Sequence, residues 1–158
     1  MLSKSLYRDN FVNLLQERLP SVKRKIFIGA TDEEHHEVDP KVVDEVRKSV
    51  APFVGDRVFF VERTREIEKY YQSADVYVMP TLREGMPNAL LEAMSCELPV
   101  VISRLEGITD WVVEDSVNGL LVSPGSVEET SRALARLIGD TDLSIELAKN
   151  ARKTIIER

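Results

Sequence analysis

Short apolar runs that alternate with longer amphipathic segments restrict the fold of this chain more than any other feature. The runs are about four residues long and rich in β-branched and aromatic side chains, as in strands buried on both faces of a parallel sheet. They lie at residues 25–28, 58–61, 76–79 and 100–102, with a weaker fifth run at residues 120–122. Helical patterns surround them at residues 9–19, 40–53, 64–72, 87–96, 109–113, 127–137 and 143–157.

This alternation predicts an α/β fold: one Rossmann-like domain over residues 1–158, with a parallel sheet between two layers of helices. Pro87 suits the first turn of a helix, and Ser126 and Asp142 are placed to cap the last two helices. All seven glycines fall outside the interiors of the expected elements. The chain opens with a helical pattern, whereas such sheets usually open with a strand and a glycine-containing phosphate loop. We therefore expect the first strand and its phosphate loop to be missing.

The charge balance argues against a nucleic-acid partner. The chain has 21 Lys+Arg against 27 Asp+Glu, a formal net charge of −6, whereas a binder of the phosphate backbone needs a basic field. Cys96 is the only cysteine and no Cys/His cluster has the spacing of zinc ligands, so we expect neither a disulfide nor a metal. No segment resembles a signal peptide or reaches the roughly 18 apolar residues of a membrane helix. These features predict a cytoplasmic protein without a cofactor, associated with a membrane only through a missing domain or partner.

The loop that follows the 76–79 run is the richest in candidate binding groups. In open parallel sheets, ligands bind beyond the carboxyl ends of the strands. Gly85 lets the backbone approach a ligand, and we expect the N–H groups of Asn88 and Ala89 to be free at the positive end of the next helix. We predict that they hold a phosphate without a metal. Arg83 adjoins this site and is a candidate for the same phosphate, with an ordinary surface arginine as the alternative.

Two glutamates flank the start of that helix, with seven residues between them. Glu92 lies one helical turn beyond Asn88, so the two share a face. A carboxylate there can accept hydrogen bonds from both hydroxyls of a ribose, which makes Glu92 the candidate ribose ligand. Glu84 lies nearer the phosphate and would meet hydroxyls of the group that the phosphate carries. The alternative is that both are solvated carboxylates, one in a loop and one in a first helical turn.

At these residues the sequence resembles a known family. Residues 74–80 read Ala-Asp-Val-Tyr-Val-Met-Pro, and residues 83–94 read Arg-Glu-Gly-Met-Pro-Asn-Ala-Leu-Leu-Glu-Ala-Met. Further matches are Leu-Pro-Val-Val at 98–101 and Val-Asn-Gly-Leu-Leu-Val at 117–122. The chain resembles, over most of residues 24–158, the C-terminal nucleotide-sugar-binding domain of retaining glycosyltransferases of family 4, also called group 1. The resemblance implies one half of a GT-B fold.

The resemblance assigns roles to these residues. Glu92 would bind the ribose, and Glu84, as the catalytic candidate, would contact the donor sugar. The backbone that would hold the diphosphate is that of Gly85, Met86, Pro87, Asn88 and Ala89.

Two further segments would complete the donor site. The nucleotide base would lie against the loop formed by Val61, Glu62 and Arg63, and Gly29 would line the same cleft. By this resemblance the substrate is a nucleoside-diphosphate sugar, and the reaction transfers its hexose to an acceptor hydroxyl with the anomeric configuration kept.

The chain also departs from the family. The phosphate loop and the acceptor-binding N-terminal domain have no counterpart, so an acceptor domain or a partner chain would be needed for transfer. The family usually has Gly where this chain has Glu97, and a left-handed Glu97 would cost about 1 kcal/mol relative to Gly. Asp110 stands where the family often has Glu. An exposed sheet edge left by a missing strand would allow a homodimer.

Two other functions stay open. One is a non-catalytic nucleotide-sugar-binding module that works with a separately encoded partner chain, and the other is a GT-B relative such as a nucleotide-sugar epimerase. We expect Tyr70 and Tyr71 on the buried side of their helix. We also expect Trp111 in core or domain-edge packing, and an exposed Trp111 would instead mark a partner surface.

Overall fold

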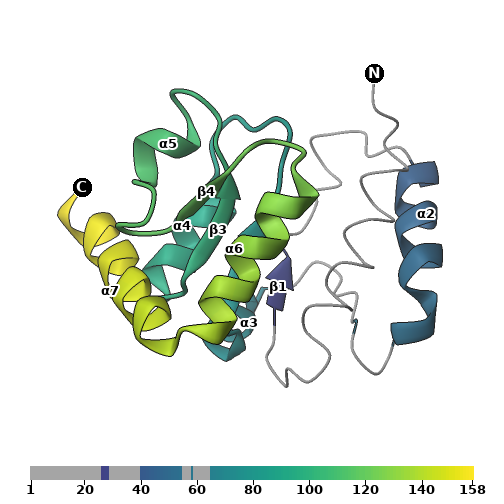
Figure 1. Cartoon of the computed structure of the whole chain (residues 1–158), viewed down its shortest axis with the longest axis horizontal. Helices are drawn as coiled ribbons and strands as arrows, with labels where there is room; N and C mark the ends of the chain where they lie inside the picture. The colour runs from purple at the N-terminus through teal and green to yellow at the C-terminus, as the bar shows by residue number, and fades with distance from the viewer. Residues whose placement is uncertain (1–25, 29–39, 55–57, 59–64) are drawn as a thin grey trace.

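Four short strands form the centre of the fold (Figure 1). The computed structural model describes residues 26–28, 40–54, 58 and 65–158. The strands are β1 (Ile26–Ile28), β2 (Val76–Met79), β3 (Val100–Ser103) and β4 (Leu120–Val122). They pair in parallel in the order β1-β2-β3-β4, with Phe27 opposite Tyr77, Val78 opposite Val101 and Ile102 opposite Leu121. The predicted parallel α/β sheet is confirmed.

The helices follow the predicted order with small shifts at their ends. They are α2 (Pro40–Val50), the short 3-10 helix η1 (Ala51–Phe53), α3 (Ile67–Ser73), α4 (Asn88–Ser95), α5 (Thr109–Val112), α6 (Val127–Gly139) and α7 (Thr141–Glu157). The prediction that Asp142 caps the last helix is wrong. Asp140 caps α7 instead, because its carboxylate accepts a hydrogen bond from the Leu143 N–H at 3.0 Å. Asp142 lies within the first turn.

Two predicted elements fall mainly outside the described residues. The expected helix at 9–19 lies outside them altogether. Of the expected strand at 58–61 only Val58 is described, and it forms an isolated parallel bridge with Val54. None of the described helices is long and apolar enough to cross a bilayer.

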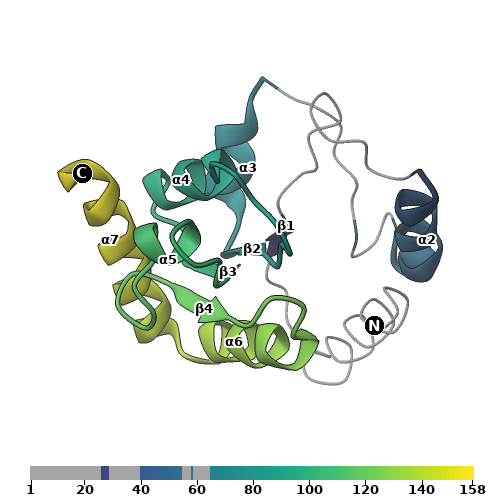
Figure 2. The ribbon, with the colours of Figure 1, turned by 90° about the horizontal axis from the view of Figure 1, so that it is seen from above.

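The core has two parts because successive strand residues face opposite sides of the sheet. Tyr77, Val100 and Ile102 face α3, α4 and α5, whereas Val76 and Val101 face α6. Figure 2 shows α3 and α4 on one side of the sheet and α6 on the other. Helix α7 contacts both α4 and α6 and contributes to both clusters. This is the predicted layered architecture, and it presents the carboxyl ends of β2, β3 and β4 along one edge.

Helix α4 ends on a residue in the left-handed conformation. Glu97 has a φ of 59°, and the N–H of Leu98 donates to the Ala93 carbonyl while that of Glu97 donates to the Met94 carbonyl. This pair of bonds is the Schellman arrangement, which normally ends on Gly. The chain therefore carries the strain of about 1 kcal/mol that its departure from the family implied.

Candidate functional site

The loop from β2 to α4 contains the predicted anion-binding residues. Its hydrogen bonds differ in part from the prediction: the N–H of Asn88 donates to the Met86 carbonyl at 2.8 Å, whereas the sequence suggested that it is free. The N–H of Gly85 donates to the Glu84 carboxylate at 3.1 Å. The physical reason is that the chain turns sharply at Met86 and Pro87 before α4 begins, and this turn uses the Asn88 N–H. A ligand at this helix end would therefore compete with bonds inside the loop.

The surface of this loop is open. Gly85 has nothing within 4 Å of the position that a Cβ would take, so its backbone can be approached from solvent. Met86 is 72% exposed, Arg83 is exposed and Pro87 is buried under the start of α4. The Thr81 hydroxyl donates to the Arg83 carbonyl at 2.7 Å and holds the first turn of the loop. The loop thus combines an internally bonded backbone with outward-facing side chains.

Glu92 lies in an open groove of about 490 Å³ between α3 and α4. The groove is lined by Ile67, Glu68, Tyr71, Asn88, Leu91, Glu92, Ser95 and Cys96. The Glu92 side chain is exposed, and its Oε2 accepts a hydrogen bond from the Tyr71 hydroxyl at 3.1 Å. The structure therefore brings Asn88 and Glu92 together on one surface, as their spacing predicted. Arg83, Glu84, Gly85, Met86 and Ala89 do not line this groove.

The negative charges of both candidate carboxylates affect the pKa of one buried phenol, that of Tyr77. Burial raises the pKa of Tyr77 well above its ordinary value, and the neighbouring Tyr71 and the negative charges of Glu84 and Glu92 raise it further. Tyr77 is in β2 and fully buried. Glu84, from a loop, and Glu92, from a helix, therefore both lie near the phenol of Tyr77.

Sequence reasoning missed the role of Tyr71 at this groove. Tyr71 was expected only as a buried residue of its helix, and it is 2% exposed, but its hydroxyl reaches Glu92. No short motif signals this contact, because 21 residues separate the two positions. Tyr70, also expected on the buried side, is 37% exposed, so that expectation is wrong. A helix turns by about 100° per residue, and on the short α3 the side that carries Tyr71 faces the core, which turns Tyr70 toward solvent.

Four predicted donor-site residues lie outside the described residues: Gly29, Val61, Glu62 and Arg63. Their contacts stay predictions. Among the residues that the structure does describe, no group of three or more His, Cys, Asp or Glu side chains is arranged to hold a metal ion.

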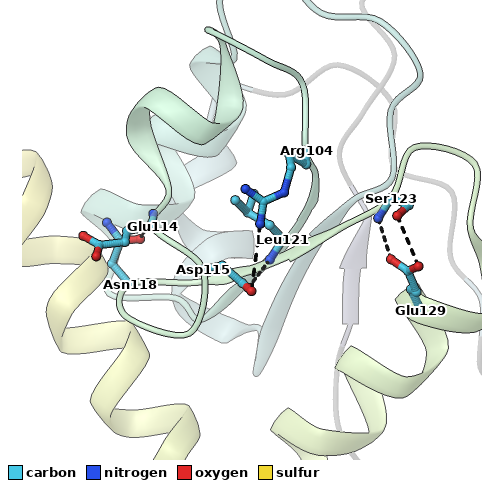
Figure 3. Close-up of polar contacts among 7 residues, drawn as sticks. All are labelled: Arg104, Glu114, Asp115, Asn118, Leu121, Ser123 and Glu129. Atoms are coloured by element: carbon cyan, nitrogen blue, oxygen red, sulfur yellow. Dashed lines mark hydrogen bonds and ion pairs between the residues drawn. The ribbon is translucent and has the colours of Figure 1, made fainter.

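The loops after β3 and β4 are held by carboxylates (Figure 3). Arg104 follows β3 and its guanidinium points toward Asp115, with Nη2 at 4.0 Å from Oδ2. The other oxygen of Asp115 accepts the N–H of Leu121 at 2.8 Å. Asp110 accepts the N–H of Gly107 at 2.7 Å and so holds the turn in which Gly107 has a φ of 71°. These carboxylates hold the backbone of the segment that connects β3 to β4 and of β4 itself.

Glu129 ties α6 to the end of β4. Its carboxylate accepts the N–H of Ser123 at 2.7 Å and the Ser123 hydroxyl at 3.1 Å (Figure 3). The Ser126 hydroxyl caps the helix, as predicted, by accepting the N–H of Glu129. The bond from the Ser123 backbone, followed by that from its side chain, lowers the pKa of Glu129 below its ordinary value.

Replacing Glu129 with glutamine should therefore lower stability in a pH-dependent way. Because the folded pKa is below the unfolded one, the contribution of this carboxylate is full above the ordinary value of 4.5 and is lost as the pH falls through the folded pKa. Thermal melts from neutral pH into the acid range should show a lower Tm for Glu129→Gln at neutral pH and convergence with the wild type in acid. Glu128→Gln is the matched control, because Glu128 pairs only with an exposed Arg132 at 3.8 Å among the described ion pairs. Equal pH dependence in both variants would contradict the assignment.

The expected core packing of Trp111 is wrong. Helix α5 buries Thr109 and Val112, and Trp111 projects away from them with 70% of its surface exposed. The Arg158 guanidinium lies 5.5 Å from the centre of its ring and donates to the Trp111 carbonyl at 2.6 Å. A four-residue helix buries only the side that carries Thr109 and Val112, which leaves the indole outside.

Comparison with known proteins places this geometry in context. Residues 4–140 match the family described as "Glycosyl transferases group 1". An uncharacterised glycosyltransferase of Haemophilus influenzae is 28% identical over 139 residues, which are 88% of this chain and 37% of that protein. The sulfoquinovosyl transferase SQD2 of Arabidopsis thaliana is 40% identical over 90 residues, 56% of this chain and 18% of that protein. The chain thus spans well under two thirds of these relatives.

Solved structures share the fold. The C-terminal domain of the group 1 family protein LpcC from Francisella tularensis superposes with a TM-score of 0.73 at 22% identity, covering 100% of this chain and 80% of that one. Anabaena HepE in complex with UDP-glucose gives a TM-score of 0.77 at 26% identity, covering 94% of this chain and 40% of that one. The described domain therefore matches the C-terminal half of a GT-B fold.

Proposed function

The chain belongs to the group 1 glycosyl transferases and has the fold of their C-terminal domain, and from that premise we propose that it binds the nucleotide-sugar donor for a retaining hexosyl transfer. The observation that carries the proposal is the placement of Glu92. Its exposed carboxylate lies in an open groove beside Asn88, one turn into the helix that follows β2. A carboxylate at this point can accept both hydroxyls of a ribose.

The start of α4 and the residues before it would meet the diphosphate and the sugar. Negative charge develops on the diphosphate as the glycosidic bond breaks, and the positive end of a helix and a nearby arginine stabilise such charge without a metal. Arg83 is exposed beside this helix end. One Glu84 oxygen accepts the Gly85 N–H, which directs a carboxylate that would accept hydroxyls of the donor sugar. Glu84 is the residue that we place against the transferred sugar.

The acceptor would be held elsewhere. The chain corresponds to 37% of its Haemophilus relative, so the proposed transfer includes an N-terminal acceptor domain or a partner chain. A second candidate, a nucleotide-sugar-binding module that works with a separate partner, is favoured by the exposure of Trp111. The relatives named above are transferases, which favours both candidates over an epimerase. Both candidates use the same donor site.

Calorimetric titration tests this donor site. We expect one of UDP, GDP and ADP, and its glucose conjugate, to bind the wild-type chain, with UDP tried first because the HepE structure holds UDP-glucose. Glu92→Ala should weaken binding of both ligands at least tenfold, about 1.4 kcal/mol, because two hydrogen bonds to a charged group are lost. Glu84→Ala should weaken binding of the sugar nucleotide more than binding of the free nucleotide.

Glu114→Ala is the matched control, because Glu114 is an exposed carboxylate that lies outside the groove. Its titration should equal that of the wild type. Absence of binding by all three nucleotides at millimolar concentration would contradict the proposed donor site, as would equal losses in Glu92→Ala and Glu114→Ala.

A further inference from the structure

We propose that Tyr71 is a positioning residue that holds the Glu92 carboxylate in the orientation needed to take the ribose hydroxyls, an inference that rests on the proposed function. The contact itself is direct: the Tyr71 hydroxyl donates to Glu92 Oε2 at 3.1 Å across the groove between α3 and α4. Tyr71 would not touch the nucleotide. It would act through the carboxylate that does.

Packing holds the Tyr71 side chain in place, whereas the Glu92 side chain lies in solvent. Tyr71 is 2% exposed, and its ring meets that of Tyr77 edge to face, with centroids 5.9 Å apart and an interplanar angle of 76°. Tyr77 is fully buried in β2 and paired with Phe27 and Val100 in the sheet. Glu92 is exposed on α4. The hydrogen bond therefore links Glu92, whose side chain has several rotatable torsions, to a ring that packs against the centre of the sheet.

The chemistry leaves the ribose enough acceptor sites. An ionised carboxylate offers about four lone-pair positions, so one bond from Tyr71 leaves sufficient sites for two ribose hydroxyls. Burial, and then the charge of Glu92, raise the pKa of Tyr71 far above its ordinary value. The phenol therefore keeps its proton at neutral pH and remains a donor to the carboxylate.

Holding Glu92 before the ligand arrives lowers the entropy cost of binding. Immobilising one side chain of this kind costs an amount that corresponds to roughly a twofold to twelvefold change in affinity. We expect the Tyr71 hydroxyl to contribute about fivefold within that range. A purely structural bond between α3 and α4 would instead lower the stability of Tyr71→Phe and leave its Kd for the nucleotide unchanged.

A double-mutant cycle separates these two roles. NMR titrations, which reach millimolar Kd, would measure UDP binding to the wild-type chain, Tyr71→Phe, Glu92→Ala and the double variant, with GDP or ADP replacing UDP if it binds more tightly. Tyr71→Phe removes only the hydroxyl and keeps the ring packed on Tyr77. We expect it to weaken binding about fivefold in the wild-type background and to have no effect when Glu92 is alanine. Tyr70→Phe, the same change on the adjacent exposed tyrosine, should bind as the wild type does.

Each other outcome overturns the inference. A fivefold loss that persists without the Glu92 carboxylate would show that Tyr71 acts on the fold, and an unchanged Kd in Tyr71→Phe would show that it does not orient Glu92. A wild-type chain that binds no nucleotide would refute the proposed function and this inference with it. A chain that binds nucleotide and loses affinity in Glu92→Ala, but not in Tyr71→Phe, would refute only the inference.

Discussion

Leu90→Ala is expected to lower the free energy of unfolding by about 3 kcal/mol, within the range found for deleting a buried leucine. Leu90 is on α4 and fully buried, and it belongs to the same core cluster as Met94, Val100 and Ile102. Alanine would remove the two methyl groups and the methine carbon of Leu90 where the sheet and the helix fix the backbone on both sides. Urea denaturation should show a lower midpoint with an unchanged slope.

The neighbouring leucine is the matched control for this variant. Leu91 is only half-buried and lines the groove, so Leu91→Ala should cost less than half as much as Leu90→Ala. Equal losses in the two variants would contradict the assignment of Leu90 to the core. Leu90 packs α4 against the sheet, and α4 carries both Asn88 and Glu92. The packing of Leu90 therefore also determines where the proposed ribose site lies.

Asn118→Ala is expected to cost a similar amount, about 3 kcal/mol, for a different reason. Asn118 is 4% exposed; its Oδ1 accepts the Glu114 N–H at 2.8 Å, and its Nδ2 donates to the Val112 carbonyl at 3.1 Å and the Thr154 hydroxyl at 2.9 Å. One side chain thus joins the end of α5, the next turn and α7. In Asn118→Ala, the Glu114 N–H, the Val112 carbonyl and the Thr154 hydroxyl would each lose a hydrogen-bond partner. Each loss costs roughly 1–3 kcal/mol where water cannot replace the bond.

Two variants identify the hydrogen bonds as the cause. Asn118→Asp keeps the shape but replaces the Nδ2 donor, so urea denaturation should show a loss about as large as that of Asn118→Ala. Asn150→Ala removes a single hydrogen bond that is more exposed to solvent, from Nδ2 of Asn150 to the Val117 carbonyl at 2.8 Å. This variant should cost less than about 1 kcal/mol. An Asn118→Asp variant as stable as the wild type would contradict this account.

The predictions that succeeded depended on local pattern. The runs at 76–79, 100–102 and 120–122 became β2, β3 and β4 with ends shifted by at most one residue, because a strand buried on both faces must be apolar throughout. The Ser126 cap was correct because the capping bond spans only three residues. Asp140 and Asp142 are both suitable caps, and the place where α6 ends decided between them.

At the site, the chain alone indicated which residues share a helix face but not what they contact. The pairing of Asn88 with Glu92 follows from one turn of helix, and the structure brings both to one groove. The use of the Asn88 and Gly85 N–H groups inside the loop was not predictable, because it depends on how the turn at Met86 closes. The exposure of Trp111 likewise depends on which side of a single helical turn meets the sheet.

The sequence by itself determined the family, the order of strands and helices, and the identity of the residues at the end of β2, because these are written in periodicity, spacing and short motifs. Only the tertiary structure decided that Tyr71 reaches Glu92, that Tyr77 supports Tyr71, and that Asn118 joins α5 to α7. These contacts join residues up to 36 positions apart. Such contacts form only when separate helices pack on a shared sheet, and no local pattern in the chain specifies how two packed surfaces meet.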